Sequence, residues 1–172
     1  MTRTSFEDFN CSAARALDVL GDKWTMLVIR DAFYGVSSFS QFQKRLGIAR
    51  NVLSDRLEHL VNCDILERKP VRPGVDRYAY SLTEQGKTVF PILVALVQWG
   101  DKWKSGSAGE PVQILDRKSR APVQPVGVLA RDGRFLTPSD VFYAPGPGAT
   151  EETLRIFERV ERKRSGARKE SA

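Results

Sequence analysis

A chain of 172 residues is long enough for one well-buried domain with an appendage, or for two very small domains. Its 27 Lys and Arg residues outnumber its 21 Asp and Glu residues, and the net charge of +6 suits a partner rich in phosphate. Two separated cysteines and a single histidine argue against a disulfide scaffold and against a metal site, and we expect no cofactor.

The N-terminal elements are expected to be helices. Apolar residues recur at helical spacing over residues 13–20. Asp22 is placed to cap a second helix over residues 23–33, which is apolar on most of its sides. A helix of that kind belongs at the centre of a core, so residues 23–33 are predicted to be the central helix.

A helix-turn-helix pattern follows. Ser38 and Gln41 fit a capping box at the start of a short helix over residues 39–46. Gly47 ends that helix, and a longer one is expected over residues 49–63. Two helices joined by such a turn are typical of proteins that insert the second, recognition helix into the DNA major groove.

The periodicity then changes from helical to alternating. Strands are expected over residues 65–71 and 77–82, joined by a turn-rich tip at residues 72–76 that includes Pro73. Asp64, just before the first strand, is expected to adopt the left-handed conformation that favours glycine. A hairpin directly after a helix-turn-helix predicts a wing.

A long helix is expected next, capped by Thr83, kinked at Pro91 and reaching about Trp103. Its apolar positions recur at coiled-coil spacing, and a monomer of this size does not leave so long a stripe exposed. The residues predicted to form a dimer interface are Leu17, Val89, Leu93, Leu96, Trp99 and Trp103.

The C-terminal third is predicted to contain a small β-ribbon and a helix. Strands are expected over residues 112–115, 123–130 and 135–143, with a hairpin turn at Asp132 and Gly133 joining the last two. A charged amphipathic helix is expected over residues 151–163. The fold class is therefore mainly α with a β-hairpin wing, a winged helix-turn-helix. The predicted domains are residues 1–105 for DNA binding and dimerisation, 106–110 for a linker, 111–164 for a C-terminal extension and 165–172 for a disordered tail.

Side chains at the start of the recognition helix can read DNA bases. Arg50 can bond guanine through two hydrogen bonds, and Asn51 can do the same with adenine. Basic residues on the hairpin can contact phosphates or the minor groove. The residues predicted to contact double-stranded DNA are Ser38, Gln41, Ala49, Arg50, Asn51, Ser54, Asp55, Arg68, Lys69, Arg72 and Arg77.

Six motifs in order strongly resemble the HxlR family, MarR-like winged-helix regulators of bacteria and archaea. They are CSAARALDVLGDKW at 11–24, LVIRD at 27–31, FSQF at 39–42, LSDRL at 53–57, ILER at 65–68 and YSLTEQG at 80–86. The resemblance covers about residues 11–104 and implies a homodimer that binds a pseudo-palindromic operator near its own or a neighbouring gene. Asp64 departs from the family's usual glycine, and Ser12 from its usual proline.

Cys11 is a candidate sensor of oxidants or electrophiles. It opens the first helix, and a helix N-terminus stabilises a thiolate. In the family, a cysteine at this position is a redox or quinone sensor in some members and unused in others. Two alternatives stay open: Cys11 is a small packing residue, or a small aromatic effector binds between the first helix and Trp99 and Trp103 while Cys11 is a bystander.

The sequence therefore predicts a transcriptional regulator, in the first place a repressor that binds its operator as a homodimer. The alternative is a winged-helix module for protein contacts without specific DNA binding, which the basic hairpin disfavours. An enzyme is not expected, because no nucleophile–base pair or phosphate-cradling glycine loop is present. No signal peptide is visible, and the apolar stretch at residues 90–99 is too short to span a bilayer, so we expect a cytoplasmic protein with no membrane partner.

Overall fold

The computed structural model describes residues 5–72, 74–75 and 77–169, and the chain divides into two units. The larger unit spans Ala16–Gly127, and the smaller combines the chain up to Arg15 with the chain from Val128 onward. The larger unit therefore runs past residue 105, where the sequence predicts the end of the first domain. A short 3-10 helix, η1 (Gly106–Ala108), takes the place of the predicted linker, and the segment after it belongs with the larger unit.

The helices that begin the chain match their predictions closely: α1 (Ser12–Leu20), α2 (Lys23–Phe33), α3 (Phe39–Leu46) and α4 (Arg50–Asn62). The Asp22 side chain accepts hydrogen bonds from the backbone of Trp24 and Thr25, which confirms it as the cap of α2. Val28 and Ile29 of α2 have no exposed surface, and α2 contacts α3, α4 and the hairpin strand β2 (Tyr78–Leu82). The second helix is thus the central one, as its apolar composition predicts.

Local chemistry fixes the turn between α3 and α4. The capping box at Ser38 and Gln41 is present in both directions, and Gly47 has a left-handed φ of 63°. After α4, Asp64 has a φ of 54°, which confirms the expected left-handed residue. The capping box provides hydrogen bonds for backbone N–H groups at the start of α3, and the two left-handed residues let the chain change direction at a helix end.

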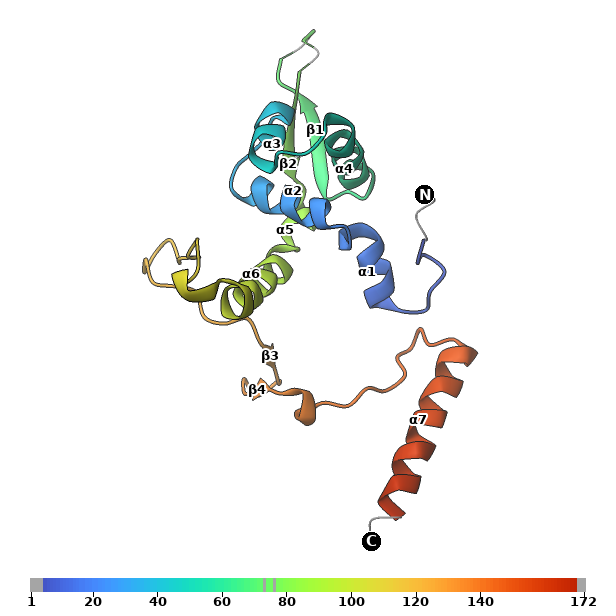
Figure 1. The fold of residues 1–172 in the computed structure, drawn as a ribbon. Coiled ribbons are helices and arrows are strands. Elements are labelled where there is room, and N and C mark those ends of the chain that lie inside the picture. Colours follow the sequence, from blue (N-terminus) through green and yellow to red (C-terminus); the bar gives the residue numbers. More distant parts are fainter. Residues whose placement is uncertain (1–4, 73, 76, 170–172) are drawn as a thin grey trace. The chain divides into compact units, whose positions relative to one another are not determined.

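The wing is an antiparallel hairpin of β1 (Leu66–Pro70) and β2, with Leu66 opposite Leu82. Figure 1 shows it extending past α3 and α4. The strands are slightly shorter than predicted, and the turn expected at Pro73 and Asp76 lies outside the described residues.

The prediction of a single long helix after the wing is wrong. Thr83 caps a one-turn helix, α5 (Glu84–Lys87), and a separate helix, α6 (Phe90–Lys104), follows it. Pro91 explains the break, because a proline ring clashes with the carbonyl four residues earlier, here that of Lys87. Proline is tolerated in the first turn of a helix, so it starts α6 rather than kinking a longer one.

Two of the residues predicted for the dimer interface, Val89 and Leu93, are not available for one. Val89 lies between α5 and α6 and is only 4% exposed, and Leu93 in α6 is 6% exposed. Both residues are buried within the chain, and Val89 belongs to the hydrophobic core. Leu96 and the two tryptophans of α6 remain exposed.

A buried ion cluster joins α2 to α3. Asp31 has no exposed surface, and its carboxylate accepts hydrogen bonds from Arg30 at 2.9 and 3.0 Å and from Nε of Arg45 at 3.1 Å. The hydrogen bond and charge of Asp31 raise the pKa of Arg45 above its ordinary value. Two guanidinium groups therefore compensate the only carboxylate found fully buried among the described residues.

The smaller unit is held at the start of its helix. It contains the strands β3 (Val128–Leu129) and β4 (Phe135–Leu136), the 3-10 helix η2 (Pro138–Asp140) and α7 (Glu151–Lys169). The Asn10 side chain donates to Gly148 O at 3.0 Å and accepts from Thr150 N at 3.2 Å and from Thr153 Oγ1 at 2.7 Å. One asparagine of the N-terminal segment thus anchors the first turn of α7.

Two predictions for the C-terminal third need correction. The strands are two residues long, because Pro122 and Pro125 lack the N–H that a strand ladder needs and because Thr137 caps η2 where a strand was expected. The tail predicted to be disordered from residue 165 is helical up to Lys169, since its Arg, Lys and Ala residues favour helix, and residues 170–172 lie outside the described part. In the part of the chain that the structure describes, no helix is long and apolar enough to cross a membrane.

Removing the buried carboxylate should destabilise the larger unit. We expect Asp31→Ala to lower its free energy of unfolding by about 3 kcal/mol, because Arg30 and Arg45 lose their shared partner. Urea denaturation followed by far-UV circular dichroism measures the change. Glu84→Gln is the control, because it breaks an exposed pair with Lys87 and should cost less than about 1 kcal/mol. Equal losses of unfolding free energy for the two substitutions would show that the Asp31 cluster stabilises the larger unit no more than an exposed ion pair does.

Candidate nucleic-acid interface

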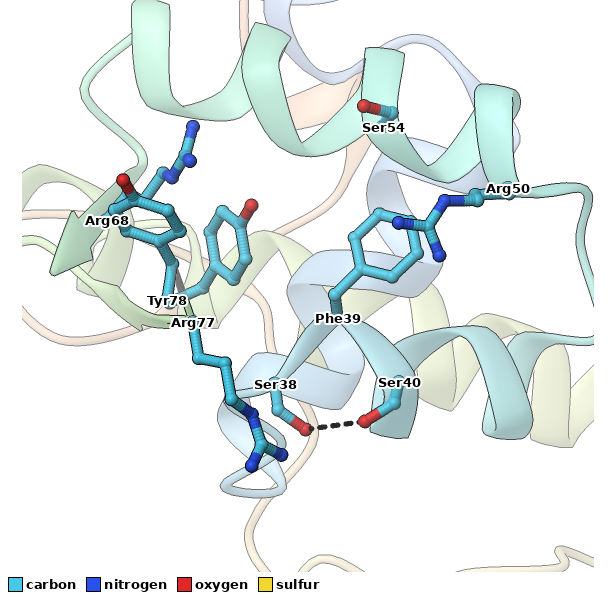
Figure 2. Close-up of a pocket in the computed structure, with 9 residues that line it drawn as sticks. Ser38, Phe39, Ser40, Arg50, Ser54, Arg68, Arg77 and Tyr78 are labelled. Atoms are coloured by element: carbon cyan, nitrogen blue, oxygen red, sulfur yellow. Dashed lines mark hydrogen bonds between the residues drawn. The ribbon is translucent and has the colours of Figure 1, made fainter. Parts of the chain in front are cut away.

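Backbone bonds bring the hairpin next to the helix-turn-helix. The N–H of Tyr80 donates to Ser37 O at 2.7 Å, and Ser38 forms an isolated β-bridge with Ala79. Strand β2 therefore runs beside the start of α3, and a cleft of about 450 Å³ opens between α3, α4 and the hairpin. Figure 2 shows the side chains around it. The lining residues are Ser38, Phe39, Ser40, Arg50, Ser54, Arg68, Arg77, Tyr78 and Tyr80.

The cleft is built to receive negative charge. Among the residues that the structure describes, three arginines line it and no acidic residue does. The first backbone N–H groups and the capping hydroxyl of α3 lie at the same place, because Ser38 is the N-cap residue. Arginine side chains around a helix start suit a phosphate group.

Aromatic rings hold two of the arginines. The guanidinium carbon of Arg50, the first residue of α4, lies 4.9 Å from the ring centroid of Phe39. That of Arg68 in β1 lies 3.6 Å from the ring centroid of Tyr78 in β2. These cation–π contacts restrict the two side chains while leaving both residues exposed.

The outer face of α4 presents the other predicted contacts. Arg50, Asn51, Ser54 and Asp55 are all exposed, whereas Leu53, Leu57 and Leu60 on the other side are buried. Ala49 is the exposed N-cap residue of α4 and makes no side-chain cap bond. One helix face is therefore open for contact, and it borders the cleft through Arg50 and Ser54.

Some predicted contacts are occupied or lie apart from the cleft. The amide oxygen of Gln41 accepts the N–H of Ser38 at 3.2 Å, so the capping box uses it. Lys69 pairs with Glu67 at 2.6 Å, and hydrogen bonds from Lys69 and Ser81 hold the pKa of Glu67 below its ordinary value. Arg72 is exposed near the wing tip and does not line the cleft.

The sequence interpretation missed four lining residues: Phe39, Ser40, Tyr78 and Tyr80. Tyr78 and Tyr80 alternate on one face of β2, so the period-two pattern identifies them as a pair on the same side as Arg68. The contact between Phe39 and Arg50 joins separate helices, and no local pattern in the sequence signals it.

An apolar surface remains uncovered on the helices away from the wing. Leu96, Trp99 and Trp103 are 50, 56 and 62% exposed, and Leu17 of α1 is 55% exposed. The sequence predicts these four residues for a dimer interface. Ile92 of α6 is also exposed, one turn before Leu96, and was not predicted. We call Ile92, Leu96, Trp99 and Trp103 the α6 stripe.

Cys11 is exposed and lies immediately before α1. Its carbonyl accepts a hydrogen bond from the N–H of Arg15 at 3.1 Å, so Cys11 stands at the N-cap position of that helix. The placement agrees with the predicted helix start.

Comparisons with known proteins point to one family. The family model described as HxlR-like helix-turn-helix matches residues 19–108. An uncharacterised HTH-type transcriptional regulator of Mycobacterium tuberculosis strain H37Rv is 36% identical over 137 residues, which cover 80% of this chain and 87% of that protein.

Solved structures agree with the sequence matches. The crystal structure of PA1607, assigned as a transcription factor, is 38% identical with a TM-score of 0.78, and the match covers 83% of this chain and 100% of that one. PA1374 of Pseudomonas aeruginosa, assigned likewise, is 35% identical with a TM-score of 0.60 over 84% and 99% of the two chains. The redox regulator HypR in its reduced form is 28% identical with a TM-score of 0.50 over 54% and 92%.

The first two structures match beyond the winged helix, so they share part of the C-terminal extension. The family model spans more than half of the chain, and the matched proteins are transcriptional regulators. This chain belongs to the HxlR-like helix-turn-helix family of DNA-binding transcriptional regulators.

Proposed function

We propose that this protein is a repressor that binds a pseudo-palindromic operator as a homodimer. The observation that carries the proposal is the arginine-lined cleft between α3, α4 and the wing, which continues into the open face of α4. In this proposal the cleft holds the sugar–phosphate backbone, and Arg50 and Asn51 read base edges in the major groove. The fixed guanidinium groups lose less conformational freedom when they bind.

The remaining candidate is a protein-interaction module. Its partner would have to present acidic groups to the same three arginines, whereas a DNA phosphate satisfies them in any sequence. A salt-dependent mobility shift with the DNA upstream of the protein's own gene tests the proposal. A reporter gene fused to that DNA should be more active when the regulator gene is deleted. Absence of a shift at low salt would favour the protein-interaction module.

Base reading should depend on Arg50. We expect Arg50→Ala to weaken operator binding by about 1–3 kcal/mol, because a bidentate contact to guanine is lost. Fluorescence anisotropy with a labelled operator measures the loss, and a scrambled duplex should show a smaller one. Arg134→Ala is the control, since Arg134 is exposed and pairs only with Asp132 in the hairpin turn. An unchanged operator affinity for Arg50→Ala would remove Arg50 from the readout.

The wing arginine Arg77 should act on phosphates. We expect Arg77→Ala to weaken binding to all duplexes alike and to flatten the plot of log K against log salt by about one unit. Lys69→Ala should flatten it less, because the Glu67 carboxylate already neutralises Lys69. A loss confined to the operator would instead assign Arg77 to base contacts.

The α6 stripe should form the dimer contact together with Leu17. Two recognition helices must reach successive major grooves, about one helical turn apart, to bind a palindrome. Light scattering should give the mass of a dimer at micromolar concentration, and Trp103→Glu should shift the protein toward the monomer and weaken operator binding. Phe142→Glu is the control, because Phe142 is 80% exposed and lies outside the stripe. A monomer mass for the unmodified protein would refute the proposed assembly.

Cys11 stays the candidate sensor residue. Its exposure and its position at the start of α1 support a role in detecting oxidants or electrophiles. The similarity to HypR, a redox regulator, agrees with such a role but covers only the winged helix. The competing small aromatic effector between α1 and the α6 tryptophans stays a prediction as well.

A further inference from the structure

A second cavity lies on α6, apart from the arginine-lined cleft. It measures about 160 Å³ and lies between α6 and residues 110–123, which we call the strap. Its apolar wall comes from Val97 of α6 and from Ile114 and Val123 of the strap. The cavity opens to solvent and has a mixed polar and apolar lining, and its volume leaves room for a single ring or a short alkyl chain.

Specific hydrogen bonds hold the strap against α6. The Gln98 side chain donates to Gln124 O at 3.1 Å and accepts from Val126 N at 2.7 Å. Within the strap, Val123 N donates to Ile114 O at 2.9 Å. One side chain of α6 therefore fixes the chain just after the strap, so the cavity has a defined wall.

The cavity carries negative charge. Asp101 and Glu110 line it, and no basic residue does within the described ranges of the chain. Glu110 is exposed, and a hydrogen bond from Gln113 to its carboxylate at 3.0 Å lowers the pKa of Glu110. Asp101 is half-buried, and no other residue in the described part of the chain offers its carboxylate a hydrogen bond or an ion pair. A cation in the cavity would provide the missing partner.

We propose that this cavity binds a small organic ammonium compound whose apolar body is about one ring in size. The ammonium group would lie between Asp101 and Glu110, and the body would contact Val97, Ile114 and Val123. The partly apolar wall explains why an organic amine suits the site better than a bare inorganic cation, which would gain nothing from those side chains.

The site is separate from the proposed dimer contact. At 100° per residue, Val97 and Asp101 lie on the side of α6 opposite Trp99 and Trp103. A ligand can therefore enter whether or not the α6 stripe is covered by a second copy. A bound ligand would contact the side of α6 that faces away from the α6 stripe. Such a ligand site is separate from the DNA contacts proposed above.

Benzylammonium is the probe, titrated calorimetrically into the full-length protein without DNA. Benzyl alcohol and benzoate are matched neutral and anionic probes, and we expect both to bind at least about tenfold more weakly, since one charge-assisted hydrogen bond is worth that factor. Asp101→Asn should reduce benzylammonium affinity about tenfold. Glu84→Gln, which removes an exposed carboxylate elsewhere, should leave the affinity unchanged.

A second variant tests the cavity itself. Val97→Phe places a ring in the space and should abolish binding while the far-UV circular dichroism spectrum stays that of the unmodified protein. If Val97→Phe alters the spectrum, Glu110→Gln is used, and the loss of its carboxylate should weaken benzylammonium binding. Equal binding of benzoate, unchanged affinity in Asp101→Asn, or no heat with millimolar benzylammonium would each overturn the proposal. Operator binding is measured separately, so failure here does not count against the regulator function.

Discussion

The buried carboxylate of Asp31 is the constraint on which the helix-turn-helix depends. It lies in α2 without exposed surface and binds Arg45 near the end of α3. A carboxylate in such a place costs several kcal/mol unless cations compensate it, so α3 can occupy only a position that brings Arg45 within reach. The orientation of α3 in turn places Ser38 and Phe39 at the cleft.

Arginine paired with an aromatic ring recurs on the surface of the winged helix. Arg45 lies 5.8 Å from the ring of Tyr34, Arg50 lies over Phe39, and Arg68 lies over Tyr78. A planar guanidinium stacks on a ring and still keeps its N–H groups at the edge free for hydrogen bonds. Two of the three arginines that line the cleft, Arg50 and Arg68, are therefore restricted by rings before any partner binds, which reduces the entropy that they lose on binding.

The features that could be predicted from the sequence are those determined within a few residues. The Asp22 cap, the Ser38 and Gln41 capping box and the left-handed Asp64 each involve a side chain and a backbone only a few positions apart. The features that could not be predicted need contacts between distant segments. The coiled-coil spacing suggested that Val89 and Leu93 face a partner, yet both side chains are buried within the chain itself.

The same distinction holds for the cleft. Its arginines were predicted from the start of the recognition helix and from the basic hairpin, whereas the contact of Phe39 with Arg50 becomes apparent only in the structure. Lys69 was predicted as a phosphate contact because its charge is visible in the sequence. The pairing of Lys69 with Glu67 depends on side-chain rotamers along one strand, which the alternation of residues does not determine.

The anchoring of α7 by Asn10 has a consequence for biosynthesis. The larger unit is one continuous segment, whereas the smaller unit needs a residue from near the start of the chain and residues from beyond position 148. A ribosome adds about 5–20 residues per second and releases the N-terminus first. Asn10 therefore emerges long before Thr150 and Thr153, and the winged helix can fold while the partners of Asn10 are still being translated. The smaller unit can therefore be completed only after the whole winged helix has been translated.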